Sequence, residues 1–552
     1  MRKWLFTIGG FLALQNFSLA VQETVFDYNA LISTPLNPRT LKTTENNGIV
    51  TEEVMFHSEK DGDKDIEIFA LFSYPKDGKM LPAYVWNQGG LGQATTHWTE
   101  RGAKRGYAVL CIDFPMPGYR STGDYPIVSG LELGDDPRKA PIYHGTVALL
   151  KAVSYLESRP EVDKNRIGMA GMSWGGFYTT LMVGLDPRLK VGSSMFGTGS
   201  LHLGNIWWDG QGWDTKRDKA FRERWRQTLD PAWRLQDRKV PLAWITGTND
   251  WFYWMPALMQ SYQMAAGRKH LSLLPNWDHS FTGNFGTQTF AWLDVHLKGE
   301  PEFIKVTPLK VAKQGRNLIA QWNFSGPRKV VSANLMFSYG DWGNWTSRYW
   351  STLKAEIKGN TCTVTLPSSP LPYYIGGMVI DTDDFYYSTP LLRINPADFK
   401  LKGRSALLDY DGCSEWGGFE RSHISYLLGH GYPAPSVSED AREGTQSAIL
   451  KVGKTTIYPI YFTVGIPHRF TAYLKADKPV QVTVELSGQF NGKPTTQEQK
   501  FQIATEWTPV SMDFTPPSDI LSVRFGANFT VPEGATVLAD SVSFRPIQQA
   551  RG

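Results

Sequence analysis

The chain is poor in cysteine, with 3 residues in 552, and its formal net charge is only +4. A small, odd number of thiols argues against a fold held together by disulfides, and their spacing does not match a zinc site. Lysine and arginine are interspersed along the chain without a basic block. We therefore expect neither a catalytic metal or other cofactor nor a nucleic-acid partner.

Long apolar runs are absent after the first twenty residues, so no later segment is predicted to cross a membrane. The N-terminus begins with Met1-Arg2-Lys3, continues with the apolar run 4–14 and reaches small residues at Ala20. A positive start, a short apolar stretch and small residues are typical of a secretory signal peptide. The pattern predicts cleavage after Ala20 and a secreted or periplasmic protein.

The length of 552 residues exceeds what one hydrophobic core supports, so several domains are expected. Helical and strand patterns alternate up to about residue 300, whereas short period-two strands follow Pro301 and, after a linker, Leu401. We predict a signal peptide over 1–20, an α/β catalytic domain over 21–300, and β-sandwiches over 301–398 and 401–552. The changes in secondary-structure pattern after Pro301 and near Leu401 predict that the three domains have independent hydrophobic cores.

Residues 171–176, Gly-Met-Ser-Trp-Gly-Gly, have the spacing of a nucleophile elbow. They follow the apolar run 166–170 and precede the helix-forming run 177–183. Glycines flank the serine because the backbone is strained there and side chains would collide with the strand and the helix. Such a turn exposes the Ser173 hydroxyl and aims the Trp174 N–H at a substrate carbonyl. A chance match is the alternative, and the downstream residues favour the elbow.

An acid and a histidine follow the serine, each at the end of a predicted strand. Asp250 ends the segment 240–250, and His279 lies in the loop after the strand at 271–275. Open parallel sheets place their chemistry at the carboxyl ends of strands. The pattern assigns His279 as the base for Ser173 and Asp250 as the acid that orients its ring. Asp278 is the rival acid, although a residue adjacent to the histidine rarely reaches its ring.

A second oxyanion donor is expected from the turn after the strand at 82–87. Its glycines would let a backbone N–H approach the substrate oxygen closely, and we assign the donor to Gly90 or Leu91, beside that of Trp174. Gln88 stands where lipase-like enzymes carry a histidine, and we include it among the substrate-binding residues. The alternative is an ordinary turn.

These motifs resemble the α/β-hydrolase superfamily over about residues 50–300, with a doubly wound sheet as the implied fold. The resemblance is to acetyl xylan esterases and dienelactone-hydrolase-like proteins, and more distantly to prolyl oligopeptidases. It lies in the strand at 106–114, the turn at 118–121 and the acid turn at 247–250. The resemblance implies a triad of Ser173, Asp250 and His279. The replaced histidine and the tryptophan after the serine depart from the lipase-like pattern.

Aromatic residues make up 13% of the chain, with 20 tryptophans, many of them between the serine and the acid. This fold often inserts a cap there, and flat aromatic faces stack on sugar rings. We predict that Trp207, Trp208 and Trp251 line the substrate pocket. The alternative is that these rings only pack the cap against the sheet.

The two β regions differ in their resemblances. Residues 305–395 predict an immunoglobulin-like sandwich. Residues 405–546 resemble jelly-roll carbohydrate-binding modules, from the stretch 443–448 to a closing strand at 537–544. That resemblance implies a structural calcium ion, for which Glu443 and Asp540 are candidate ligands, although oxygen-rich turns are usually only turns.

The sequence favours a secreted serine esterase that acts on esterified carbohydrate, most plausibly an acetyl esterase on a polysaccharide, through an acyl-enzyme. One alternative is a prolyl-oligopeptidase-like peptidase with the same triad, and another is an inactive hydrolase scaffold that binds carbohydrate. The ordered Ser-Asp-His pattern argues against the second alternative. The sequence leaves the acyl group, the sugar and the oligomeric state open.

Overall fold

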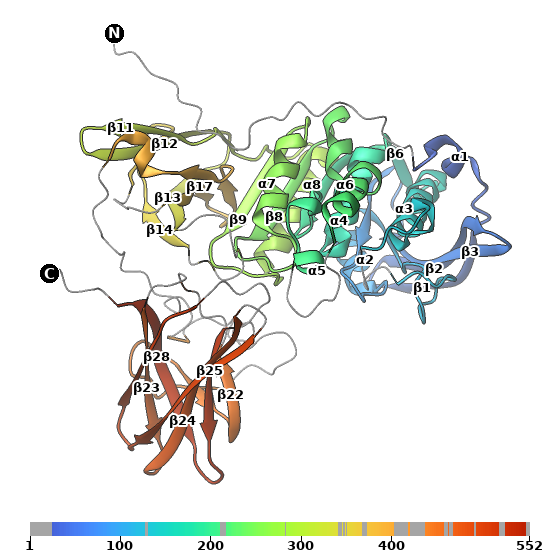
Figure 1. The fold of residues 1–552 in the computed structure, drawn as a ribbon. Coiled ribbons are helices and arrows are strands. Elements are labelled where there is room, and N and C mark those ends of the chain that lie inside the picture. The colour runs from blue at the N-terminus through green and yellow to red at the C-terminus, as the bar shows by residue number, and fades with distance from the viewer. Residues whose placement is uncertain are drawn as a thin grey trace.

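The structure is a computed structural model that describes residues 25–126, 131–209, 217–281, 283–339, 345, 348, 350–366, 372–401, 418–419, 436–457, 462, 467–490, 493–517 and 525–547. The predicted signal peptide and Cys413 lie outside these residues. Three regions follow one another along the chain (Figure 1), an α/β domain and two regions built from strands.

A nine-stranded sheet forms the first domain, in the order β1-β2-β3-β5-β4-β6-β7-β8-β9. The first three strands pair antiparallel, and β3 joins β5 antiparallel, whereas the strands from β5 to β9 pair parallel. Their bounds are β1 Arg39–Asn46, β2 Ile49–Asp61, β3 Lys64–Pro75, β4 Leu81–Asn87, β5 Ala108–Ile112, β6 Val162–Met172, β7 Leu189–Met195, β8 Leu242–Gly247 and β9 Lys269–Leu274. All residues of β5 and β8 are buried, as expected for parallel strands covered on both faces.

Helices cover both faces of this sheet. One apolar core joins one face to α3, α4 and α7, and a second core joins the other face to α2 and α8. The helices are α1 Tyr28–Ser33, α2 Thr96–Ala103, α3 Pro141–Ser158, α4 Trp174–Leu185, α5 Ile206–Asp209, α6 Lys219–Thr228, α7 Met255–Met264 and α8 Gly283–Lys298. Short 3-10 turns span Pro137–Lys139, Leu201–Leu203, Ala232–Asp237 and Pro396–Phe399. The doubly wound sheet predicted from the sequence is confirmed.

The second domain is a sandwich of two five-stranded sheets. One contains β10 Lys305–Val306, β11 Lys310–Gln314, β12 Asn317–Ser325, β15 Glu356–Lys358 and β16 Thr361–Thr365, and the other contains β13 Val330–Tyr339, β14 Ser351–Lys354, β17 Tyr373–Asp381, β18 Tyr386–Ser388 and β19 Leu392–Ile394. In β12 buried and more exposed residues alternate, with Leu318, Ala320 and Trp322 facing inward. This period of two is the pattern of a strand with one face in a core.

The second domain packs directly against the sheet edge formed by β9. The Leu273 N–H donates to Ser388 Oγ at 3.0 Å, and Gln288 Nε2 donates to the Tyr386 carbonyl at 3.2 Å. Both apolar cores of the first domain continue into the sandwich, where they include Trp322 and Trp350. The prediction of independent cores is therefore wrong at Pro301, because residues on either side of it contribute to the same two apolar cores.

A second two-sheet sandwich forms the C-terminal region and has a core of its own, built from residues between Phe419 and Phe544. One sheet has the order β20-β21-β28-β23-β26 and the other the order β22-β27-β24-β25. Their bounds are β20 Ser436–Ser438, β21 Ser447–Leu450, β22 Gly453–Ile457, β23 His468–Ala476, β24 Val480–Phe490, β25 Lys493–Ile503, β26 Thr508–Phe514, β27 Gly526–Val531 and β28 Val537–Pro546. The predicted sandwich is confirmed, while its likeness to carbohydrate-binding modules stays a prediction.

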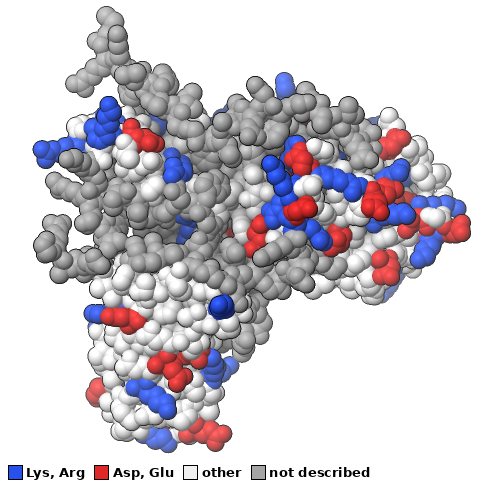
Figure 2. All heavy atoms as spheres, viewed as in Figure 1, with Lys and Arg blue, Asp and Glu red and all other residues white. Residues whose placement is uncertain are grey.

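Charged side chains of both signs are mixed over the described surface that Figure 2 shows, as the interspersed sequence pattern leads one to expect. Several charged side chains of the protein pair, such as Arg222 with Asp209 at 2.6 Å and Arg188 with the buried Asp186 at 2.6 Å. Within the described part of the chain, no helix has both the length and the apolar character needed to span a membrane.

The two boundaries predict opposite results for two truncations. A chain ending near Leu401 should keep the melting temperature and small-ester turnover of the first two domains, because the C-terminal core is separate. On an insoluble polymer this shorter chain should lose activity, because only a polymer gains from a second contact point.

A chain ending near residue 300 exposes the shared core and should aggregate or melt at a much lower temperature. Calorimetry and turnover of p-nitrophenyl acetate test both, and an unfolded 21–401 fragment would contradict the first expectation.

Candidate active site

Ser173 lies at the sharp turn between β6 and α4, with φ 56° and ψ −120°. Non-glycine residues rarely adopt positive φ, and a strained turn of this kind is a frequent property of functional sites. Gly175 makes the turn feasible, since a Cβ there would lie 2.2 Å from the Asn87 carbonyl oxygen. The N-terminus of α4 can therefore pack against the end of β4. Ser173 and the loop that follows β4 become neighbours as a result.

His279 joins the serine to the acid. Its Nε2 lies 2.8 Å from Ser173 Oγ, and its Nδ1 lies 3.0 Å and 2.9 Å from the two carboxylate oxygens of Asp250. Asp250 follows β8 and His279 follows β9, so the two loops meet at the carboxyl edge of neighbouring parallel strands. Asp250 is 1% exposed and His279 is 8% exposed. The three residues that the sequence singled out are thus brought together, and the Nδ1 side of the ring faces Asp250.

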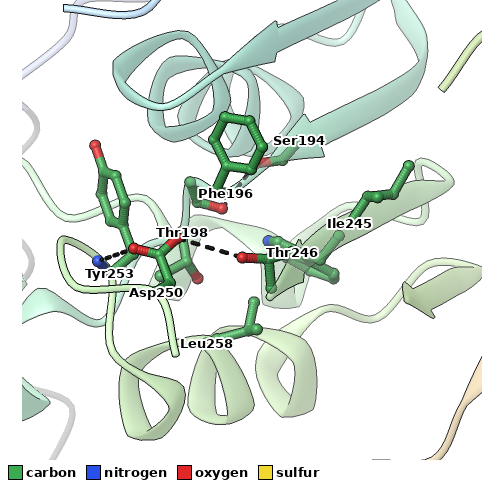
Figure 3. Close-up of a pocket in the computed structure, with 10 residues that line it drawn as sticks. Ser194, Phe196, Thr198, Ile245, Thr246, Asp250, Tyr253 and Leu258 are labelled. Atoms are coloured by element: carbon green, nitrogen blue, oxygen red, sulfur yellow. Dashed lines mark hydrogen bonds between the residues drawn. The ribbon is translucent and has the colours of Figure 1, made fainter. Parts of the chain in front are cut away.

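The carboxylate of Asp250 is held by its own loop (Figure 3). Its Oδ1 accepts the Phe252 N–H at 2.9 Å. Figure 3 draws the other two donors, the Tyr253 N–H, 3.0 Å from Oδ1, and the hydroxyl of Thr246 in β8, 3.3 Å from Oδ2. These donors stabilise the charged carboxylate at a nearly water-free position. Burial, and secondly the charge of Asp250, raise the pKa of Tyr253. The phenol therefore stays neutral beside the acid.

The sheet order and these positions together decide the fold family. An antiparallel edge leads into parallel strands, the serine follows β6 at a strained elbow, and the acid and the histidine follow β8 and β9 in that chain order. The first domain has the α/β-hydrolase fold.

In this fold the loop after β4 lies against Ser173. A Cβ on Gly89 would be 3.5 Å from Ser173 Cβ. The Gly92 N–H donates to the Gly89 carbonyl at 3.0 Å, so Gly90 and Leu91 occupy the centre of a tight turn. Leu91 has φ 63°, a conformation that costs a non-glycine residue about 1 kcal/mol or more. The Trp174 N–H is the first of α4 and has no partner within the helix. The assignment of the oxyanion donors to Trp174 and to Gly90 or Leu91 stays a prediction.

Sequence reasoning missed the ion pair that holds this loop. The buried Asp113 accepts the Ala94 N–H at 2.6 Å and pairs with the Arg120 guanidinium at 2.7 Å. Arg120 in turn donates to the Ala94 carbonyl at 2.7 Å and stacks 4.0 Å from the centre of the Phe69 ring. Both backbone groups of Ala94 are thereby bonded, which fixes the far end of the turn at 88–94. A charged residue at the end of a buried strand was the available signal.

Aromatic rings surround the base. The rings of Phe196 and Phe252 lie 4.8 Å and 4.6 Å from the His279 ring, centre to centre. Phe196 also has a positive φ of 36°. It follows Met195, whose carbonyl accepts the Ser173 N–H at 2.9 Å. These rings exclude water from the neighbourhood of the reacting atoms, which strengthens electrostatic interactions there. Sequence reasoning singled out Trp251, the neighbour of Phe252, but did not identify Phe196.

The predicted pocket residues are mostly buried. Trp207, 2% exposed, packs against Trp174 with ring centres 4.9 Å apart, and Trp208, also 2% exposed, packs edge-on against Trp225 at 5.6 Å. Neither tryptophan offers an open face to a sugar, so the packing alternative describes them better. Gln88 is buried with its amide 3.7 Å from Cys111 Sγ, so it faces the interior. Trp251 is half-buried beside Phe252, and its role in substrate binding stays a prediction.

Two other groups have defined surroundings. Burial raises the pKa of Cys111 to about 12, so this thiol stays protonated and is no rival nucleophile.

In the C-terminal domain, Asp540 accepts the N–H groups of Arg442 at 2.7 Å, Glu443 at 3.0 Å and Ser541 at 2.6 Å. Within the described ranges, no three His, Cys, Asp or Glu residues form a cluster that could hold a metal ion. The calcium site with Glu443 and Asp540 stays a prediction.

Comparison with known proteins found no matching family model. Two curated proteins are similar in sequence, and both are named "Putative carboxymethylenebutenolidase". The protein from Methylorubrum extorquens is 26% identical over 172 residues, which cover 30% of this chain and 56% of the relative. The protein from Synechocystis sp. is 27% identical over 150 residues, or 26% of this chain and 56% of the relative. The chain thus spans just over half the length of the curated relatives it matches.

Among solved structures, the chain is similar to an acetyl xylan esterase from Paenibacillus sp. R4, with a TM-score of 0.42, 20% identity, and coverage of 49% of this chain and 92% of that protein. It is also similar to an acetyl xylan esterase from a Thermoanaerobacterium species, with a TM-score of 0.41, 17% identity, and coverage of 49% and 93%.

Proposed function

We propose that this protein is a serine hydrolase of carboxylic esters, with Ser173, His279 and Asp250 as its catalytic residues. The observation that carries the proposal is the continuous line of contacts from Asp250 through His279 to Ser173 Oγ, each between 2.8 and 3.0 Å. A hydroxyl is a poor nucleophile until a base within hydrogen-bond distance takes its proton. The sequence likeness to two proteins named as carboxymethylenebutenolidases also supports hydrolase chemistry.

In the first half-reaction, Ser173 Oγ attacks the ester carbonyl while its proton moves to His279 Nε2. Asp250 keeps the Nδ1–H proton directed at itself and stabilises the imidazolium that forms. The negative oxygen of the tetrahedral intermediate accepts backbone N–H groups from Trp174 and from the turn at Gly90 and Leu91. His279 then gives its proton to the leaving alcohol, and an acyl-enzyme remains on Ser173.

In the second half-reaction, water replaces the alcohol. His279 Nε2 takes a proton from that water, whose oxygen attacks the acyl carbonyl, and the same N–H groups stabilise the second tetrahedral intermediate. Collapse releases the carboxylic acid and returns the proton to Ser173 Oγ. No cofactor takes part in this scheme.

For the substrate class, we propose small acyl groups on carbohydrate, with acetylated polysaccharide as the best candidate. The rings of Phe196 and Phe252 lie against the base, and we expect the acyl group beside them to be short, such as acetyl. The predicted signal peptide and the resemblance of the C-terminal region to carbohydrate-binding modules fit a polymeric substrate outside the cytoplasm.

A panel of substrates tests both levels of the proposal. We expect rapid hydrolysis of p-nitrophenyl acetate, slower hydrolysis of the octanoate, and acetate release from acetylated xylan. A glucuronoyl ester and an X-Pro amide serve as comparison substrates and should react far more slowly. Preferred cleavage of the amide would replace the esterase by the peptidase alternative, and a preferred octanoate would overturn the small-acyl proposal.

A further inference from the structure

The loops that carry Asp250 and His279 are bonded to each other before they reach these residues. The Asn249 N–H donates to the Trp277 carbonyl at 2.9 Å, and the Asn276 N–H donates to the Thr248 hydroxyl at 2.9 Å. Asn249 directly precedes Asp250, and Asn276 lies three residues before His279. These bonds therefore connect the backbone segments that carry the two side chains.

Asn276 also bonds to the second domain. Its Nδ2 donates to the Trp350 carbonyl at 2.8 Å, and its Oδ1 accepts the Trp350 N–H at 2.7 Å. The side-chain amide therefore pairs with the backbone of one residue through both of its ends. Asn276 has φ 55°, a conformation that asparagine tolerates better than most residues. Asn276 and Trp350 are 2% and 1% exposed, so water competes little for these bonds.

Asn249 makes a second bond across the same boundary. Its Nδ2 donates to the Arg348 carbonyl at 2.5 Å, and its Oδ1 accepts the Thr248 hydroxyl at 2.7 Å. Asn249 is 2% exposed. Since Thr248 also accepts the N–H of Asn276, one chain of hydrogen bonds runs from Arg348 through both loops to Trp350.

The segment that receives these bonds belongs firmly to the second domain. The Arg348 guanidinium stacks over Trp345 at 4.6 Å and over Tyr374 of β17 at 5.0 Å. Trp345 packs edge-on against Tyr374 with ring centres 4.9 Å apart. The backbone of residues 348 and 350 is therefore anchored to a sheet of the sandwich and can hold the two loops in place.

We propose that Asn249 and Asn276 are positioning residues through which the second domain sets the Asp250–His279 geometry. Neither asparagine is bonded to the reacting atoms. Each fixes a loop whose displacement would lengthen the contacts between Nδ1 and Asp250 or between Nε2 and Ser173. A misplacement of about 1 Å lowers the rate by about 100-fold in such sites. This inference rests on the proposed ester hydrolysis and makes the second domain part of the active-site structure.

The variants that test this inference are Asn249→Ala, Asn276→Gly and their combination. Glycine accepts the positive φ of position 276 and removes the amide without adding charge. Gln288→Leu is the matched control. The side-chain amide of Gln288 also donates a hydrogen bond to a backbone carbonyl of the second domain, that of Tyr386, but Gln288 lies on α8. Thermal unfolding of all four proteins reports the purely structural cost, and a single variant carries the test should the double variant unfold.

The first readout is kinetics on p-nitrophenyl acetate. Each single variant should lower kcat by ~10- to 100-fold with little change in KM, because the geometry of the catalytic groups changes and the substrate contacts do not. Gln288→Leu should keep kcat at a comparable loss of melting temperature. Equal kcat in the asparagine variants and the control would overturn the inference, and so would a rise in KM at unchanged kcat.

The second readout does not depend on turnover. The proton between His279 Nδ1 and Asp250 should give a downfield NMR signal that His279→Ala removes. It should shift or broaden in the asparagine variants and stay unchanged in Gln288→Leu, and an unchanged signal in all of them would overturn the inference. A wild-type protein without esterase activity would refute the proposed function, whereas the NMR comparison would still decide the positioning role.

Discussion

Replacing Ser173 with alanine should lower kcat for p-nitrophenyl acetate by about 10⁴-fold or more while the protein stays folded. The substitution removes the oxygen that lies 2.8 Å from His279 Nε2 and keeps the Cβ, so the strained turn is unchanged. Without the nucleophile no acyl-enzyme forms, and only the oxyanion donors and substrate binding contribute to the rate. Steady-state kinetics and circular dichroism of the purified variant measure both parts of the prediction.

Ser193→Ala provides the control for this experiment. Ser193 is a buried serine of the neighbouring strand β7, and its hydroxyl lies 3.2 Å from Thr289 Oγ1 of α8. Its loss costs a hydrogen bond of similar kind away from the triad, so activity should persist. Full turnover by a pure Ser173→Ala preparation would show that another residue is the nucleophile.

Replacing Asp250 with asparagine should lower kcat by about 10⁴-fold without unfolding the protein. The N–H groups of Phe252 and Tyr253 both donate to Oδ1, so the asparagine oxygen must remain at that position. The new NH₂ group then takes the place of Oδ2, which lies 2.9 Å from His279 Nδ1. Nδ1 accepts a hydrogen bond from this NH₂ group, which favours the ring tautomer with its proton on Nε2. His279 can no longer take the proton of Ser173.

Asp278→Asn is the comparison for Asp250→Asn, because it makes the same chemical change one residue before the base. Its effect on kcat should be much smaller, since the Nδ1 side of the His279 ring faces both oxygens of Asp250. The measurement is kcat for p-nitrophenyl acetate in both variants at one pH. If Asp278→Asn were the more damaging change, Asp278 would be the orienting acid.

The positions of the catalytic candidates could be predicted from the sequence because each depends on local pattern. Ser173 lies between a buried strand and a helix with glycines at fixed offsets, and Asp250 and His279 follow apolar runs with the pattern of buried strands. Parallel strands have their carboxyl ends at one edge of the sheet, and this rule predicts that the three residues lie close together. The change to period-two strands after Pro301 was equally local, and it predicted the β-sandwiches.

The surroundings of the site depend on contacts between distant parts of the chain, which local pattern does not contain. The sequence could not show that Trp208 and Gln88 face the interior, because burial depends on which elements pack against them. Asn249 and Arg348 are 99 residues apart, and Asn276 and Trp350 are 74 apart. The sequence by itself determined the chemistry and the order of the triad. Only the tertiary structure decided that a second domain shares the hydrolase core and holds the loops of the acid and the base, because side-chain amides pair with whatever backbone the fold brings to them.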